Sequence, residues 1–181
     1  MSSLFRWPLG RKDPGTPSPA TIEAIYGAIV AQARRPVFYE VFGVPDTVEG
    51  RFDMVLLHLW MVLRSLRERP DSERLAQALF DHFCSDMDAN LREMGVGDLA
   101  VPKRMRAFGE AFYGRARAYD AALAEGDSAL AAALSRNVYG DPEAARGGLL
   151  AAYAAETLAA LAVAGDAAVR DGVLPFAEPA S

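Results

Sequence analysis

The segment that decides the fold is residues 79–119, LFDHFCSDMDANLREMGVGDLAVPKRMRAFGEAFYGRARAY. Apolar residues recur at intervals of three and four on both sides of residues 95–102, which is the spacing of amphipathic α-helices. Gly95 and Gly97 are suited to end one helix, and Pro102 is suited to the first turn of the next. The segment therefore predicts two long helices joined by an elbow.

The sequence on either side of this segment predicts further helices. Ser18 followed by Pro19 is typical of a helix start, and one apolar face continues from there to about residue 35. Residues 46–49, DTVE, have the pattern of a capping box with Asp46 as the cap, and they open a central helix that ends at Pro70. Alanine-rich sequence predicts a short helix over residues 127–140 and a last helix from residues 141–142 to about residue 164. We therefore predict an all-α, single-domain helical bundle of about six helices.

Three parts are expected along the chain. Residues 20–166 form the helical domain, and residues 167–181 form a C-terminal tail, of which residues 171–181, DGVLPFAEPAS, are expected to be frayed. Residues 1–19 contain four prolines, which favours a flexible N-terminal tail. An alternative for this tail is a weak peripheral contact with a membrane, in which Phe5 and Trp7 reach the headgroup level and the neighbouring cations meet anionic lipid.

The amino-acid composition is that of an ordinary globular protein. The chain has 181 residues, of which 51% are hydrophobic and 24% charged, a balance that supports one ordinary globular core. The single Cys84 cannot form an internal disulfide, and no apolar run approaches the roughly 20 residues needed to cross a bilayer. The net charge of −5 argues against a DNA partner. We expect a cytoplasmic protein.

The spacing of the acidic and histidine side chains argues against a catalytic or metal-binding site. Asp86 and Asp88 point about 200° apart on a helix, whereas Asp81 and Asp88 share a face but lie about 10.5 Å apart along the axis. His58 interrupts an apolar helix and is expected to be a structural histidine, because no three-ligand set surrounds it. We therefore expect no catalytic residue, no metal and no cofactor. A small helical haem-binding protein or enzyme using His58 or His82 remains an alternative.

The second arm of the elbow carries a basic face. Residues 99–120 contain five basic and two acidic side chains. Such a face is either simply solvated or a contact surface for an acidic partner, a phosphate backbone or lipid headgroups. Gly109 and Gly114 are unfavourable inside a helix, so they are expected to mark the close approach of another backbone, either the chain's own or a partner's.

Two pieces of the sequence resemble a known family. They are DMDANLREMGVGD at residues 86–98 and FYGRARAY at residues 112–119, and residues 37–45, VFYEVFGVP, add weight. These pieces are similar to the ubiquinol-cytochrome c chaperone family. The resemblance implies an all-helical domain without enzymatic activity. It also implies a smaller partner protein, a place near the ribosomal tunnel exit, and newly made cytochrome b as the client.

The resulting hypothesis is an assembly chaperone for the respiratory cytochrome bc1 complex, complex III, that binds cytochrome b, other bc1 subunits or an assembly partner. A ribosome- or RNA-associated adaptor that uses the basic helix over residues 102–119 is a further alternative. The expected partner-binding residues lie on both arms of the elbow: Arg92, Glu93, Lys103, Arg106, Tyr113, Arg115 and Arg117.

Overall fold

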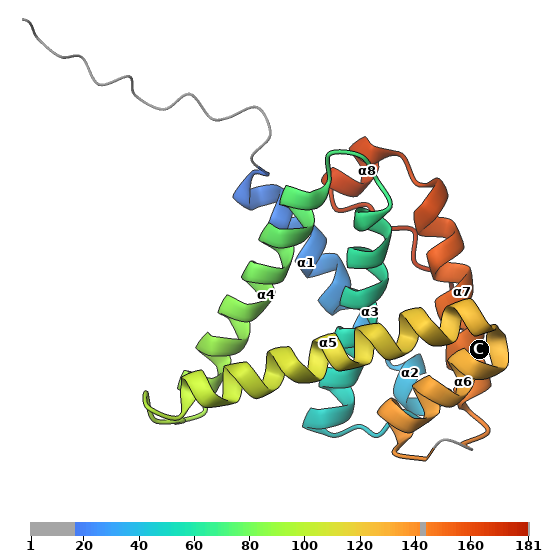
Figure 1. The fold of residues 1–181 in the computed structure, drawn as a ribbon, viewed down its shortest axis with the longest axis horizontal. Helices are drawn as coiled ribbons and strands as arrows, with labels where there is room; N and C mark the ends of the chain where they lie inside the picture. Colours follow the sequence, from blue (N-terminus) through green and yellow to red (C-terminus); the bar gives the residue numbers. More distant parts are fainter. Residues whose placement is uncertain (1–16, 142–143, 181) are drawn as a thin grey trace, which may run out of the picture.

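The computed structural model describes residues 17–141 and 144–180, and within these ranges the fold is entirely helical (Figure 1). Its elements are α1 (Pro19–Ala33), α2 (Val37–Glu40), α3 (Val48–Arg67), α4 (Glu73–Glu93), α5 (Val101–Glu125), α6 (Asp127–Leu134), the π-helical turn η1 (Ser135–Tyr139), α7 (Gly147–Val163) and α8 (Asp166–Arg170). This confirms the all-α prediction, and the predicted six helices correspond to the longer ones in the described ranges. No helix in those ranges is long and apolar enough to cross a membrane.

α3 is the centre of the bundle. It contacts α1, α4, α7 and η1, which explains why the sequence of this helix is apolar on nearly every side. Leu57, Leu59 and Met61 are completely buried along it. Its cap is one residue later than predicted, because Thr47 Oγ1 accepts a hydrogen bond from Gly50 N (3.1 Å) while Asp46 pairs with Arg51 instead.

α1 begins as the sequence predicts. The Ser18 hydroxyl accepts a hydrogen bond from Thr21 N at 3.0 Å, so it is the N-cap. The helix buries Ile25 and Ile29 against the core, and the hydroxyl of its Tyr26 donates to Asp86 of α4 at 2.7 Å. α1 is thereby fastened to α4 as well as to α3.

α4 and α5 form an open angle joined by the predicted elbow, which extends beyond the rest of the fold (Figure 1). α5 packs closely on α4 and α6, whereas α3 and α5 are joined mainly through long side chains. Gly109 and Gly114 do not mark a close approach within the described chain, because a Cβ at either position would meet nothing within 4 Å.

The C-terminal third differs from the prediction. α7 begins at Gly147 rather than at residues 141–142, and Gly147 packs so tightly that an added Cβ would lie 1.7 Å from Ser135 Oγ.

The C-terminal segment is packed against the fold over residues 171–180 rather than frayed, because Leu174, Phe176 and Ala177 pack on the core. Val169 of α8 is buried in the core. The Phe176 ring lies 5.3 Å from that of His58, and Ala177 N donates to Thr157 Oγ1 at 3.2 Å. Residues 1–16, which include Phe5 and Trp7, lie outside the described ranges.

Candidate contact surface

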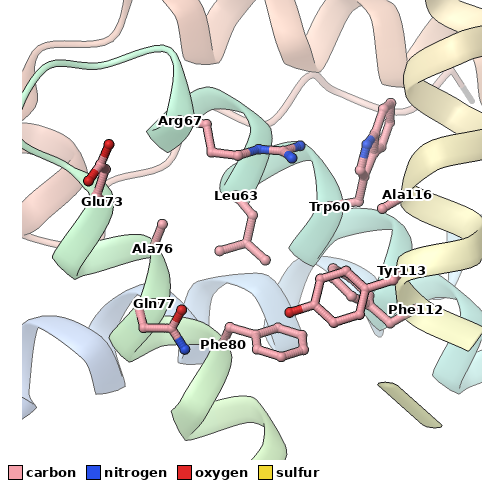
Figure 2. A pocket seen from close by; sticks show the side chains of 10 residues that line it. All are labelled: Trp60, Leu63, Arg67, Glu73, Ala76, Gln77, Phe80, Phe112, Tyr113 and Ala116. Carbon is pink, nitrogen blue, oxygen red and sulfur yellow. The ribbon is translucent and has the colours of Figure 1, made fainter. Parts of the chain in front are cut away.

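A half-open groove lies between α3, α4 and α5 (Figure 2). It encloses about 350 Å³, and its lining is mainly aromatic and aliphatic with a few polar groups. Leu63 points from α3 into the middle of the lining residues. The complete lining is Trp60, Leu63, Arg67, Glu73, Ala76, Gln77, Phe80, Phe112, Tyr113 and Ala116.

Three rings form the aromatic wall of the groove. Phe80 lies 5.1 Å from Phe112 and 5.4 Å from Tyr113, measured between ring centroids. The Tyr113 side chain reaches the surface, and 56% of that residue is exposed. An apolar side chain entering the groove would therefore replace water with ring contacts, and full burial of a leucine-sized group stabilises binding by roughly 1.5–3 kcal/mol before ordering costs.

Asp120 of α5 holds one side of the groove in place. Its carboxylate accepts hydrogen bonds from Trp60 Nε1 (3.0 Å), Arg64 Nη1 (2.8 Å) and Arg67 Nη2 (3.3 Å). Because all three donors belong to α3, this one carboxylate fixes the spacing between α3 and α5. The large side chains of Trp60, Arg64 and Arg67 thus lie between α3 and Asp120 of α5, at one side of the groove.

Arg115, one of the expected partner-binding residues, is used inside the fold. Its Nη2 lies 2.8 Å from Asp53 Oδ1 of α3, and both side chains are largely withdrawn from solvent. Burial raises the pKa of Asp53 to about 6, even though the guanidinium of Arg115 acts in the opposite direction. Tyr119 lies beside this pair, and burial also raises the pKa of its hydroxyl.

Arg92 and Glu93 lie at the end of α4, where the elbow begins. Arg92 pairs with Asp88 (2.6 Å) and with Asp98, so it bridges the helix to the elbow. Its hydrogen bond to Asp88 raises the pKa of the guanidinium. Glu93 is exposed.

The remaining expected residues lie along α5. Lys103, Arg106 and Arg117 are exposed and have no ion pair among residues 17–141 and 144–180, and Tyr113 lines the groove. The structure therefore separates the seven residues into elbow, groove and exposed cations, with Arg115 turned inward.

The sequence reasoning missed the groove itself. Ala76 and Phe80 lie four residues apart on α4, and Phe112 and Ala116 lie four apart on α5. Two such matching stripes on neighbouring helices were the available signal. Phe112 is itself buried, and which residue of α4 it meets depends on how the two helices cross.

His58 confirms the prediction of a structural histidine. It is 0% exposed, and its two ring nitrogens each lie 2.7 Å from an oxygen, Nδ1 from Met54 O and Nε2 from Tyr153 Oη. Since a carbonyl only accepts, Nδ1–H donates to Met54 and Nε2 accepts from Tyr153. Burial lowers the pKa of His58 to about 4, so the ring is neutral near pH 7 and neither nitrogen is available to a haem iron.

The three aspartates of α4 have separate partners. Asp81 accepts from Gln77, Asp86 from Tyr26 and Asp88 from Arg92. Within the described residues there is no group of three or more His, Cys, Asp or Glu side chains that could hold a metal ion. His82 instead packs edge-on against Tyr26, with ring centroids 5.0 Å apart.

Fold and site together define an all-α protein whose candidate site is a contact surface, made of an apolar groove and a charged helical arm. The model of a protein family described as ubiquinol-cytochrome C chaperone matches residues 40–176. The chain belongs to the ubiquinol-cytochrome c chaperone family, as the resemblance in the sequence indicated.

The chain is also similar to a solved structure and to curated proteins whose names fit this family. The crystal structure of the Cbp3 homologue from Brucella abortus is similar with a TM-score of 0.78 and 41% sequence identity, over 88% of this chain and 90% of that one. The ubiquinol-cytochrome-c reductase complex assembly factor 1 of Xenopus laevis is 29% identical over 63% of this chain and 58% of its own length. Protein CBP3, mitochondrial, of Saccharomyces cerevisiae is 31% identical over 57% of this chain and 32% of its own. The chain thus matches only part of the length of these curated relatives.

Proposed function

We propose that this protein is an assembly chaperone for the cytochrome bc1 complex and that it acts by binding rather than by catalysis. The single observation that carries the proposal is the family match over residues 40–176, which includes α3, α4 and α5 and therefore the whole groove. The names of the relatives, assembly factors of ubiquinol-cytochrome c reductase, support the same role.

The proposed client is newly made cytochrome b or an assembly partner. A membrane protein that is not yet assembled exposes apolar side chains, and the aromatic wall of Phe80, Phe112 and Tyr113 would shelter one of them. A groove of about 350 Å³ accommodates one or two such side chains rather than a whole helix. Binding of this kind is modest in free energy and therefore easily reversed, as a chaperone requires.

The exposed cations of α5 are proposed to guide the encounter. Lys103, Arg106 and Arg117 lie on the arm that also carries Tyr113. Unpaired surface charges act mainly on the association rate and depend on salt. They are suited to an acidic patch on a bc1 subunit, on a small partner protein or on a ribosomal surface. The proposed location is the cytoplasm, with peripheral contact at the inner membrane.

The experiment that tests the proposal is a gene deletion followed by complementation. Deletion is expected to lower both the abundance of the bc1 complex and the haem content of cytochrome b in isolated membranes. Wild-type protein and the surface variant Val163→Ser should restore both quantities, whereas Tyr113→Asp should restore them poorly, because a carboxylate would enter the aromatic wall. Unchanged bc1 abundance and haem content after deletion would overturn the proposal.

A further inference from the structure

The elbow between α4 and α5, residues 94–100, carries two of the most exposed large apolar side chains of the described fold. Leu99 is 99% exposed and Met94 is 69% exposed. The elbow is also the part of the α4–α5 angle that extends furthest from the bundle (Figure 1). Neither residue lines the groove, so the groove does not explain their exposure.

Charge is distributed unevenly around these two side chains. Residues 92–106 contain four basic and two acidic side chains, in a chain whose net charge is −5. The two acids are Glu93 and Asp98. Arg92 is occupied by its pairs with Asp88 and Asp98.

The other three cations, Lys103, Arg104 and Arg106, are exposed and have no ion pair within the described residues. They follow directly on the elbow, in the first two turns of α5. With a rise of 1.5 Å per residue, Arg106 lies only about 8 Å along the axis from the start of the helix. Their long side chains can extend further toward the elbow while the charged heads stay in water.

Apolar side chains at an extremity, followed within about 10 Å by cations, match the profile of a bilayer surface, in which the acyl boundary lies next to the headgroup phosphates. We propose that the α4–α5 elbow contacts an anionic lipid surface, with Leu99 and Met94 entering the headgroup region and Lys103, Arg104 and Arg106 meeting the phosphates.

A lipid surface fits this elbow better than a protein partner does. A specific protein interface buries about 800 Å² on each partner over a complementary surface, whereas shallow lipid insertion needs only a few apolar side chains at a tip. A Cβ placed on Gly95 or Gly97 would meet nothing within 4 Å, so the surface beside these two glycines is open. Residues 121–181 contain eight acidic and three basic side chains and would be repelled by the same lipid, so this part of the chain would face away from it.

The test is flotation of the purified full-length protein with vesicles of phosphatidylcholine, alone or mixed with phosphatidylglycerol. Binding is expected only to the mixed vesicles and is expected to weaken as salt is added. Arg104→Glu should weaken binding by at least about fivefold, the effect of roughly one cation near an anionic surface. Leu99→Ser should weaken it by about tenfold, corresponding to partial burial of a leucine. Both residues lie outside the groove and outside the expected partner-binding set.

Matched controls lie at the other end of the fold. Val163→Ser removes an apolar side chain that is 84% exposed, and Arg170→Glu reverses an exposed cation of α8; neither should change vesicle binding. Substituting Phe5 and Trp7 together by serine in the full chain separates any contribution of the N-terminal segment. The proposal is overturned if the wild type does not float with the mixed vesicles, or if Leu99→Ser and Arg104→Glu bind as well as their controls. The vesicles contain no bc1 component, so this result is independent of the test of chaperone function.

Discussion

Arg115 of α5 and Asp53 of α3 form a partly buried ion pair, with Nη2 and Oδ1 2.8 Å apart. Only 14% of the Asp53 side chain is exposed, and its pKa is raised to about 6 by burial. This pair is one of the side-chain contacts that join α3 to α5. Its energetics lead to the first prediction.

The Asp53 carboxyl should make the protein less stable as the pH rises. The pKa is about 3.8 in the unfolded chain and about 6 in the folded one, so between these values the folded state binds the proton more tightly. The contribution of Asp53 to the free energy of unfolding is therefore full below about pH 4 and lost as pH rises through about 6. Urea denaturation at a series of pH values should show that the free energy of unfolding of Asp53→Asn, relative to wild type, increases between about pH 4 and 6. An identical slope in both proteins would contradict the raised pKa.

His58 should have the opposite effect in nearly the same range. Its pKa falls from 6.5 in the unfolded chain to about 4 in the folded one, so its contribution is present above about pH 6.5 and is lost as pH falls through about 4. Because the two slopes oppose each other, we expect wild-type stability to change little between pH 4 and 6 on account of these groups. His58→Gln should unmask the Asp53 slope, and Asp53→Asn should unmask the His58 slope. Parallel curves for all three proteins would exclude this compensation.

The Tyr153 hydroxyl should contribute measurably to stability. It donates to His58 Nε2 at 2.7 Å and accepts from Gln32 at 3.1 Å inside the core. Tyr153→Phe leaves the buried ring nitrogen without a partner, which should lower the free energy of unfolding by about 1–3 kcal/mol. Tyr113→Phe is the matched control: its hydroxyl has no hydrogen bond within the described residues, so chemical denaturation should show a change within about 0.5 kcal/mol.

Asp120 should be needed for the shape of the groove. Replacing it by Ala leaves Trp60 Nε1 and Arg64 without their shared acceptor and should destabilise the fold by about 1–3 kcal/mol. We expect increased hydrogen exchange in the α3 and α5 segments that border the groove. Asp127→Ala, at an exposed position at the start of α6, is the control. Equal exchange in the two variants would show that Asp120 does not hold the groove.

The cations of α5 should act on partner capture without affecting the fold. Reversal of Arg106 and Arg117 to Glu should reduce the amount of partner captured from membranes at least about tenfold at low salt, and the difference should shrink as salt is added. Helicity measured by circular dichroism should stay unchanged, because both side chains are exposed and neither has an ion pair in the described structure. Arg115→Glu, by contrast, should destabilise the protein, because it places two carboxylates side by side. If the double reversal captured as much partner as wild type, the cations of α5 would have no role in recognition.

The sequence by itself determined the helices and where several of them begin and end. Local signals can be recognised without knowing the fold, because they depend on neighbours within a few positions. They include the three- and four-residue spacing in α3, α4 and α5, the cap at Ser18 and the glycines at the elbow. The family was also recognisable, because its motifs are continuous stretches of sequence.

Only the tertiary structure decided which side chains meet. The Asp53–Arg115 pair, the three donors around Asp120 and the packing of Phe176 on His58 join residues far apart in the chain. The groove arises in the same way, since Phe80 and Phe112 become one wall only when α4 and α5 meet. Periodicity reports which face of a helix is apolar, but crossing angle and register decide which neighbour covers that face. The way the helices pack turns Arg115 inward and covers the C-terminal segment. It leaves Leu99 exposed.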